Sequence, residues 1–319
     1  MKKVIIHIGL PKTATTSLQQ YVFEAGNGIH WNYIGVFQPR DRKQSDLYNL
    51  LMGCLSCSIQ HFEEKCRKFR ELISTTTSNL PSLISEEMLV VDQSVSWQDK
   101  LFRLKRIIEG YDVTILTTIR SPIKATFSLY VELYSSINKE YPSFDQFVKE
   151  SNQAKIFSYK KLYLLLEEYF GKKNISTVPF ELLKTGEFVK EILAELESPL
   201  NIARLPYENT QKKTTQGVIT RPVTIQHWIR KALNGPRLSL NYYIGLFLKL
   251  IGLSKNRTIC PWGRKHIPYP DFESHKEIFL DSNQWFLDHY SIDYVRESEK
   301  RVKHPKKLNL IHLGQPKSS

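Results

Sequence analysis

The chain has 319 residues, of which 41% are hydrophobic, and a formal net charge of +13. A chain of this size and composition can bury a large core, which excludes an intrinsically disordered protein and favours one α/β domain over two independent folds. The positive charge favours anionic ligands. No nucleic acid is expected as a partner, because the basic residues are spread along the chain and accompany no recognisable nucleic-acid-binding module.

The N-terminal segment predicts a strand, a turn and a helix. Residues 4–8 form a largely apolar run that suits a strand buried on both faces, and apolar residues recur at helical spacing from Leu18 to Ala25. The free N–H groups and the positive dipole end of the helix favour an anion in the turn. The predicted phosphate site consists of Pro11, Lys12, Thr13, Ala14, Thr15, Thr16 and Ser17.

This turn differs from the nucleotide triphosphate loop Gly-x-x-x-x-Gly-Lys-Ser/Thr. Counted from Gly9, Ala14 stands where the second glycine is expected and Thr15 where the lysine is expected, and the only lysine of the turn is Lys12. The turn therefore suits a single phosphate and lacks the lysine of a triphosphate site, and with it the Lys-Ser/Thr arrangement that holds magnesium. An alanine at position 14 is tolerated at negative φ and is costly at positive φ.

Residues 11–16 resemble the 5′-phosphosulfate loop of the sulfotransferase family, Pro-Lys-Thr/Ser-Gly-Thr/Ser-Thr, with Ala14 in place of the usual glycine. The resemblance implies 3′-phosphoadenosine-5′-phosphosulfate (PAPS) as cosubstrate, adenosine 3′,5′-bisphosphate (PAP) as product, no required metal and a catalytic role for Lys12. The wider spelling of residues 7–19 resembles bacterial members associated with polysaccharides and glycolipids. It implies a carbohydrate acceptor, with acidic and lipid-linked acceptors included.

A cysteine-rich segment follows. Cys54 and Cys57 have the C-x-x-C spacing, and His61 and Cys66 lie nearby. The spacings miss the paired-ligand patterns of zinc sites, so we expect reduced thiols on a helical segment and no bound metal. The four cysteines of the chain are too few for a disulfide framework and fit a reducing cytoplasm.

Residues 81–88 resemble the short central strand after which many sulfotransferases place the catalytic base. The carboxyl ends of parallel strands meet in one crevice, so we expect the strand ends at Gly9, Glu86 and Arg120 to lie together. A carboxylate there can accept the proton of an attacking hydroxyl. Glu86 is the expected base, Glu87 is the alternative, and the other acid is expected to bind a backbone amide or cap the next turn.

Residues 96–108 predict an amphipathic helix. Ser96 and Asp99 form a capping box at its start. The apolar stripe consists of Trp97, Leu101, Leu104 and Ile108. The charged residues between them, which we expect to be solvated, are Lys100, Arg103 and Arg106.

Residues 112–119 predict a second buried strand, which is rich in β-branched side chains and leads into Arg120. Pro122 can open a helix that places Ser128 about two turns along, so that the Arg120 guanidinium and the Ser128 hydroxyl can meet on one phosphate. Arg-x-Pro followed by Ser128 and Tyr130 resembles the 3′-phosphate motif of the family. The resemblance implies that Arg120 and Ser128 bind the 3′-phosphate of PAPS.

Alternating helix and strand signals continue up to residue 183. An apolar stripe from Tyr159 to Phe170 ends at Gly171, and residues 175–178 predict another strand. Residues 178–183 resemble the strand and Tyr-Glu-Asp-Leu turn of the family, with Phe180 in place of the tyrosine. We expect Glu181 to act first as a structural cap and second as a ligand.

The C-terminal part carries weaker signals. Residues 208–217 resemble the late loop that closes over the nucleotide in relatives, which makes Lys212 and Lys213 candidate ligands, with a solvated surface as the alternative. Within one domain, residues 1–218 are expected to form the nucleotide-binding core and 219–319 a mostly helical or irregular acceptor-binding region. The apolar residues 238–253 predict a helix that covers the core rather than one that lies on a membrane surface. We therefore expect no transmembrane segment and a cytoplasmic protein, with peripheral membrane contact as the alternative.

Taken together, the patterns predict an α/β fold of P-loop type, in which helices flank a parallel sheet, and a PAPS-dependent sulfotransferase that acts on a carbohydrate hydroxyl. Two alternatives remain. One is an ATP-dependent nucleotide or small-molecule kinase, which ATP with magnesium would stabilise in place of PAP. The other is a non-catalytic nucleotide-binding protein, which would bind the nucleotide without converting an acceptor.

Overall fold

The computed structural model describes residues 2–40, 42–76, 79–91, 94–202, 205, 218–221, 265–268 and 270–295. The chain divides into two compact units. The first consists of Met1–Ala125, Asn152–Leu205 and His275–Ser319, and the second of Thr126–Ser151 and Pro206–Ser274. The single domain 1–319 with a division at residue 218 stays a prediction.

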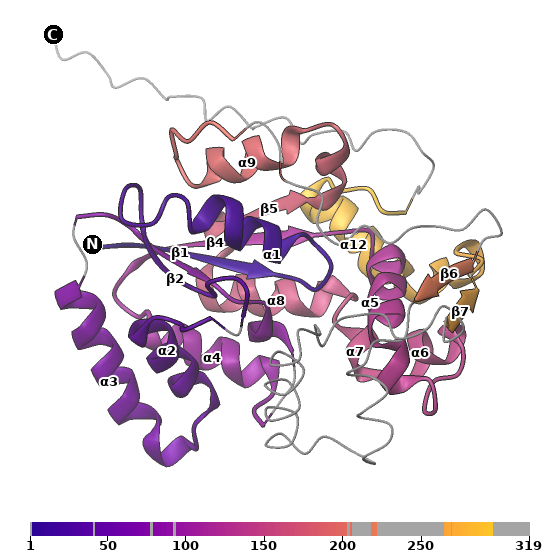
Figure 1. The fold of residues 1–319 in the computed structure, drawn as a ribbon, viewed down its shortest axis with the longest axis horizontal. Coiled ribbons are helices and arrows are strands. Elements are labelled where there is room, and N and C mark those ends of the chain that lie inside the picture. The colour runs from indigo at the N-terminus through magenta and orange to yellow at the C-terminus, as the bar shows by residue number, and fades with distance from the viewer. Residues whose placement is uncertain are drawn as a thin grey trace, which may run out of the picture. The chain divides into compact units, whose positions relative to one another are not determined.

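The first unit contains a five-stranded sheet in the order β2-β3-β1-β4-β5 (Figure 1). The strands are β1 (Lys3–Gly9), β2 (Asn32–Gly35), β3 (Ser82–Ser85), β4 (Asp112–Ile119) and β5 (Ile175–Pro179). All four strand pairings are parallel. The apolar and β-branched runs of β1 and β4 occupy the centre of the sheet, where both faces are buried. The predicted α/β class with a parallel sheet is confirmed.

Helices flank both sides of this sheet. In Figure 1, α1 and α9 lie on one side of the strands, and α2, α4 and α8 lie on the other. The helical segments of the first unit are α1 (Thr15–Leu18), η1 (Gln19–Phe23), α2 (Asp46–Ser56), α3 (Ile59–Thr76), η2 (Glu87–Val90), α4 (Trp97–Ile107), α7 (Asn152–Lys155), α8 (Tyr159–Phe170), η3 (Lys172–Asn174), η4 (Phe180–Lys184), α9 (Glu187–Glu195) and α12 (Leu280–Tyr290). The predicted helix stop at Gly171 and the predicted third strand, now β5, are confirmed.

The helix after the first strand departs from a regular α-helix. α1 spans only four residues and continues as a π-helix, η1, in which Glu24 N donates to Gln19 O at 3.0 Å. The indole N–H of Trp31 donates to Phe23 O at 2.7 Å, and so occupies a carbonyl oxygen that a continuing α-helix would use itself. The sequence pattern predicted a helix here but not its wider turn.

The core on the α1 side of the sheet joins β1, β3, β4 and β5 to the two covering helices. Its buried members include Ile5, Leu83, Leu116 and Val178 from the strands, Val22 and Phe23 from η1, and Phe188, Val189, Ile192 and Leu193 from α9. Strand residues two positions apart share a face, so His7, Ser85 and Thr118 point to the same side as these apolar residues. All three are fully buried polar side chains beside an apolar core.

The predicted solvated face of α4 is wrong for two of its three cations. Ser96 caps the helix by accepting from Asp99 N, as expected. However, Lys100 and Arg103 are only 1% and 9% exposed. The Lys100 ammonium donates to Met88 O and Val91 O, and Arg103 donates to Cys54 O, Leu55 O and Cys57 O at the end of α2. Carbonyl oxygens of other segments compensate the burial of both cations.

The second unit holds most of α5 (Pro122–Ile137), α6 (Phe144–Glu150) and an antiparallel pair, β6 (Val218–Arg221) with β7 (Lys265–Pro268). Aromatic rings of α5 and α6 pack together, with Tyr130 against Phe144 and Phe147. η6 (Glu273–Phe279) runs from this unit into the first. No helix in the described part of the chain combines the length and apolar character needed to cross a membrane.

Candidate functional site

The turn after β1 has an unusual backbone. Lys12 and Ala14 adopt φ values of 70° and 64°, in the left-handed region that glycine prefers. Between them, Thr13 is fully buried and its hydroxyl donates to Leu10 O at 2.7 Å. The sequence left open whether position 14 has negative or positive φ, and the structure gives the costly case. Alanine at a position that favours glycine therefore holds strain in the turn, which we call the phosphate loop after its predicted role and define as residues 10–16.

Replacing Ala14 with glycine is expected to raise the free energy of unfolding by about 1 kcal/mol, because glycine meets no Cβ clash in the left-handed region. Urea unfolding measures the change. The matched control is Ala25→Gly, at an exposed turn residue without positive φ, where glycine only adds chain entropy and should destabilise. A decrease in stability for both variants would contradict the strain at position 14.

Gly9 lets the phosphate loop fold back against its own strand. A Cβ at this position would lie 2.3 Å from Thr15 Oγ1 and 2.9 Å from His7 Cε1. Thr15 is itself 5% exposed, so it has little room to move. A side chain at position 9 would therefore push the loop away from the strand.

Arg120 lies directly after β4, the strand that pairs with β1. Its Nη1 donates to Lys12 O at 3.4 Å, and its guanidinium stacks on the Phe180 ring with 4.8 Å to the centroid. Its own carbonyl oxygen accepts from Tyr159 OH at 2.7 Å. The predicted meeting of the strand ends at Gly9 and Arg120 is therefore present, and the aromatic partners that hold Arg120 come from later parts of the chain.

Glu181 acts as the structural cap that the sequence predicts. Its Oε1 accepts from Ser121 N at 2.9 Å, at the start of α5, and its Oε2 accepts from Tyr294 OH at 3.0 Å. The Ser121 hydroxyl is different. It is buried and has no hydrogen-bond partner among the described residues. A buried hydroxyl without a partner beside Arg120 suits a ligand oxygen, since unsatisfied polar groups are rare in protein interiors.

The Glu86 carboxylate, at the end of β3, is fully buried and accepts four hydrogen bonds. Oε1 accepts from Arg40 Nη2 at 2.9 Å and from Met88 N at 2.8 Å, while Oε2 accepts from Arg40 Nη1 at 3.3 Å and from Tyr48 OH. Burial and the neighbouring Glu86 raise the pKa of Tyr48, so the phenol stays protonated as a donor. A carboxylate has about four lone-pair positions, and all are taken here.

For the other predicted site residues, the structure gives fewer contacts or none. Glu87 is a half-buried residue that opens η2, near enough to Arg40 to act on it electrostatically. Ser128 lies on α5 in the second unit, so its convergence with Arg120 stays a prediction. Lys212 and Lys213 lie outside the described residues.

The three described cysteines, Cys54, Cys57 and Cys66, are free thiols. Cys54 lies in α2, Cys66 lies in α3, and burial raises the pKa of both thiols. Within the ranges that the structure describes, no group of three or more His, Cys, Asp or Glu side chains is arranged to hold a metal ion. The cysteine segment therefore offers buried, weakly acidic thiols on two helices.

Burial also perturbs His7, which the sequence analysis treated only as part of a strand. Desolvation lowers the pKa of its imidazole from 6.5 to about 3. At pH values between these two pKa values, the unfolded chain binds more protons than the folded chain. The free energy of unfolding therefore falls as the pH falls. From pH 7 to pH 5 this histidine should remove about 2 kcal/mol from the free energy of unfolding. Urea unfolding of wild type and His7→Gln across this range measures the difference, and equal pH slopes would contradict it.

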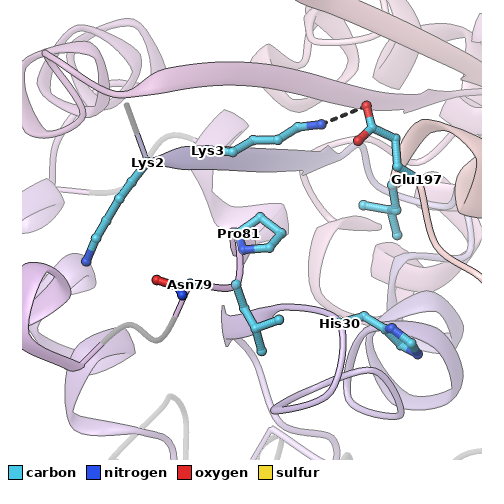
Figure 2. A pocket seen from close by; sticks show the side chains of 8 residues that line it. Lys2, Lys3, His30, Asn79, Pro81 and Glu197 are labelled. Atoms are coloured by element: carbon cyan, nitrogen blue, oxygen red, sulfur yellow. Dashed lines mark ion pairs between the residues drawn. The ribbon is translucent and has the colours of Figure 1, made fainter.

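A pocket of about 690 Å³ lies at the opposite ends of the strands (Figure 2). Lys2, Lys3 and Pro81, which line it, stand at the starts of β1 and β3, and the Lys3 ammonium pairs with Glu197 at 2.9 Å. None of the predicted site residues lines this pocket. The phosphate loop, Glu86 and Arg120 instead follow the carboxyl ends of three adjacent strands.

Comparisons with solved structures find sulfotransferases of low sequence identity among the matches. No protein-family model and no curated protein sequence matches the chain. A sulfotransferase from Alicyclobacillus acidocaldarius is 13% identical with a TM-score of 0.41, and the match covers 66% of this chain and 87% of that one. The sulfotransferase domain from the curacin biosynthetic pathway is 11% identical with a TM-score of 0.37, over 64% and 76%. Mouse sulfotransferase SULT7A1 complexed with PAP is 13% identical with a TM-score of 0.30, over 63% of this chain and 61% of the mouse protein.

Proposed function

We propose that the protein transfers a sulfuryl group from PAPS to a hydroxyl of a carbohydrate acceptor. The observation that carries this proposal is the contact between two anion-binding motifs from adjacent parallel strands. Arg120, after β4, donates to the carbonyl oxygen of Lys12 in the phosphate loop after β1. A guanidinium and an amide-rich turn next to each other suit the two phosphates of a bisphosphorylated nucleotide.

Lys12 and the loop amides bind the 5′-phosphate, and Arg120 with Ser121 and Ser128 binds the 3′-phosphate. In the reaction the bond between sulfur and the 5′-phosphate oxygen breaks as the acceptor oxygen bonds to sulfur. Negative charge accumulates on the departing phosphate oxygen, where the Lys12 ammonium stabilises it. The acceptor proton passes to a carboxylate, and PAP leaves.

Of the two acids after β3, the occupied lone pairs of Glu86 favour Glu87 as the proton acceptor. An acceptor hydroxyl could reach Glu86 only by displacing Arg40, Tyr48 or the Met88 amide. We therefore assign to Glu86 the role of holding Arg40 and Tyr48 in place, while its predicted role as base stays a prediction that the following variants test.

Glu87→Gln is expected to lower kcat by about 10²-fold, the usual loss for a general base, and to leave PAP affinity unchanged. Glu86→Gln instead removes the charge of a buried carboxylate that accepts from the half-exposed Arg40 and from Tyr48, and is expected to lower the free energy of unfolding by about 2 kcal/mol. Steady-state kinetics and urea unfolding of both variants separate the roles. If Glu86→Gln folds as stably as wild type and loses kcat, Glu86 is the base.

The proposal is tested with PAPS carrying labelled sulfate and a panel of acceptors. Neutral and acidic oligosaccharides, a glycolipid and a phenol are offered separately, with sulfated product and PAP measured together. Equal amounts of both products from a carbohydrate would support the proposal. PAP release without any sulfated carbohydrate, or transfer to the phenol alone, would contradict the acceptor class.

A further inference from the structure

A continuous chain of buried hydrogen bonds runs beneath the phosphate loop and crosses three strands. Gln38 Nε2 lies 2.6 Å from Gln19 Oε1, and Gln19 Nε2 lies 3.2 Å from Ser85 Oγ. Ser85 Oγ lies 2.8 Å from His7 Nδ1. His7 Nε2 lies 3.3 Å from Thr118 Oγ1, which is 2.8 Å from Thr13 Oγ1. Apart from the half-buried Gln38, every member is at most 1% exposed.

The donor in each of these hydrogen bonds follows from the last bond, the one that Thr13 makes. The hydroxyl proton of Thr13 goes to Leu10 O, a backbone oxygen that can only accept. Thr118 must then donate to Thr13, and His7 Nε2 must carry a proton to donate to Thr118. Neutral His7 consequently accepts at Nδ1 from Ser85, which leaves the Ser85 oxygen to accept from Gln19. Each hydroxyl donates once, and every bond has a donor.

The other neutral tautomer does not satisfy the same contacts. With the proton on Nδ1, His7 would donate to Ser85, and Ser85 would turn its proton to the nearby Tyr33 hydroxyl. Thr118 would then donate to Nε2, and no proton would remain between Thr118 and Thr13. The buried polar groups therefore favour the Nε2–H tautomer, because an unmade buried hydrogen bond is costly.

The Thr13 end of this chain of hydrogen bonds lies at the strained part of the phosphate loop. Thr13 stands between Lys12 and Ala14, the two non-glycine residues with left-handed φ. Such conformations persist only where the surroundings hold them in place. The Thr13 hydroxyl has two partners for this purpose, Leu10 O and Thr118 Oγ1.

We propose that His7 is a positioning residue, whose neutral Nε2–H form orients Thr118 and Thr13 and thereby holds the phosphate loop in its binding conformation. The proposal rests on the proposed function in so far as the loop binds PAP. The other end of the hydrogen-bond chain is Gln38, which lies two residues before Arg40, the partner of Glu86. This series of hydrogen bonds thus joins the phosphate loop to the segment that contacts Glu86 at the end of β3.

Two neighbouring threonines of β4 offer a matched pair of variants. Thr118→Val removes the hydroxyl between His7 and Thr13. Thr117→Val makes the same change one residue earlier and on the other face of the sheet, where the hydroxyl bonds to Tyr163 OH, Ser176 O and Thr177 Oγ1. Both threonines are fully buried, so each variant carries the cost of losing a buried hydroxyl. Thr118→Ser keeps the bonding group and is the rescue variant.

Thr118→Val is expected to weaken PAP binding about tenfold, as the loss of one buried hydrogen bond in the loop's support. It should also speed amide hydrogen exchange of residues 10–16 about tenfold. Thr117→Val should leave PAP affinity and amide exchange within about twofold of wild type, even if its unfolding midpoint falls as far as that of Thr118→Val. Thr118→Ser should restore both. Equal effects of the two valine variants, or none from Thr118→Val, would overturn the positioning role.

The tautomer is measured without any ligand. Nitrogen NMR of ¹⁵N-histidine-labelled protein should show His7 with a protonated Nε2 and an unprotonated Nδ1, and His7→Gln assigns the signal by its loss. A protonated Nδ1 would overturn the proposal. If wild type does not bind PAP, the proposed function is contradicted, whereas the tautomer and the exchange of residues 10–16 still decide whether His7 positions the loop.

Discussion

Lys12→Ala is expected to lower kcat for sulfuryl transfer by about 10³-fold, because it removes the cation that stabilises charge on the departing phosphate oxygen. PAP affinity should fall much less. The backbone carbonyl of residue 12, which accepts from Arg120, is kept in the variant, and so is the remainder of the phosphate loop. Single-turnover kinetics with saturating PAPS and equilibrium binding of PAP measure the two effects separately.

Lys12→Arg is the control for this prediction. It keeps the positive charge at a changed distance, so it should recover part of the lost rate. Because Lys12 has φ of 70°, alanine and arginine meet the same backbone strain, and a difference between them reports on the side chain. A kcat for Lys12→Ala within about tenfold of wild type would show that Lys12 does not act in the transition state.

Arg120→Ala is expected to weaken PAP binding by about 300-fold, since truncating one member of a buried charged pair costs several kcal/mol. Arg120 is fixed by the Phe180 ring and the Lys12 carbonyl oxygen, so the site is preorganised for its anion. The effect should appear in the Kd and KM of the nucleotide, with a smaller effect on kcat at saturation. Isothermal titration with PAP measures it.

Arg106→Ala is the matched control for the change in net charge. Arg106 is half-exposed and forms ion pairs with Glu63 and Glu109 at 3.6 Å, as surface arginines commonly do. Its removal lowers the net charge equally and should leave PAP affinity within about twofold of wild type. Equal losses for Arg120→Ala and Arg106→Ala would mean that only the general positive field attracts the nucleotide.

The sequence predicted the parts of the fold that depend on local patterns. The apolar runs of β1 and β4, the Ser96 cap and the stop at Gly171 are local signals, and the structure confirms them. The capping role of Glu181 was also predicted, from the resemblance of residues 178–183 to a strand and turn, although its partners Ser121 and Tyr294 are distant in sequence. The two strands, the Ser96 cap and the helix stop follow from side chains close in sequence, which act through backbone preference and burial.

Contacts between distant segments were not predictable in the same way. Arg103 was expected in solvent because it is a charged residue outside the apolar stripe of its helix. It instead donates to carbonyl oxygens of residues 46 to 49 positions earlier in the chain. His7 was treated as part of an apolar strand, although its partners Ser85 and Thr118 are likewise polar residues near the ends of buried strands. Polar residues that recur at the ends of neighbouring buried strands were the available signal, and strand order was needed to pair them.

The most direct test of the sulfotransferase proposal is nucleotide binding by the wild-type protein. PAP at about 100 times its Kd should stabilise the fold by about 2.7 kcal/mol, which raises the unfolding midpoint of a chain of this length by roughly 4 °C. ATP with magnesium at the same concentration should produce a much smaller shift, because Thr15 stands where the lysine of a triphosphate site is expected. A larger shift with ATP and magnesium than with PAP would contradict the account and favour a kinase.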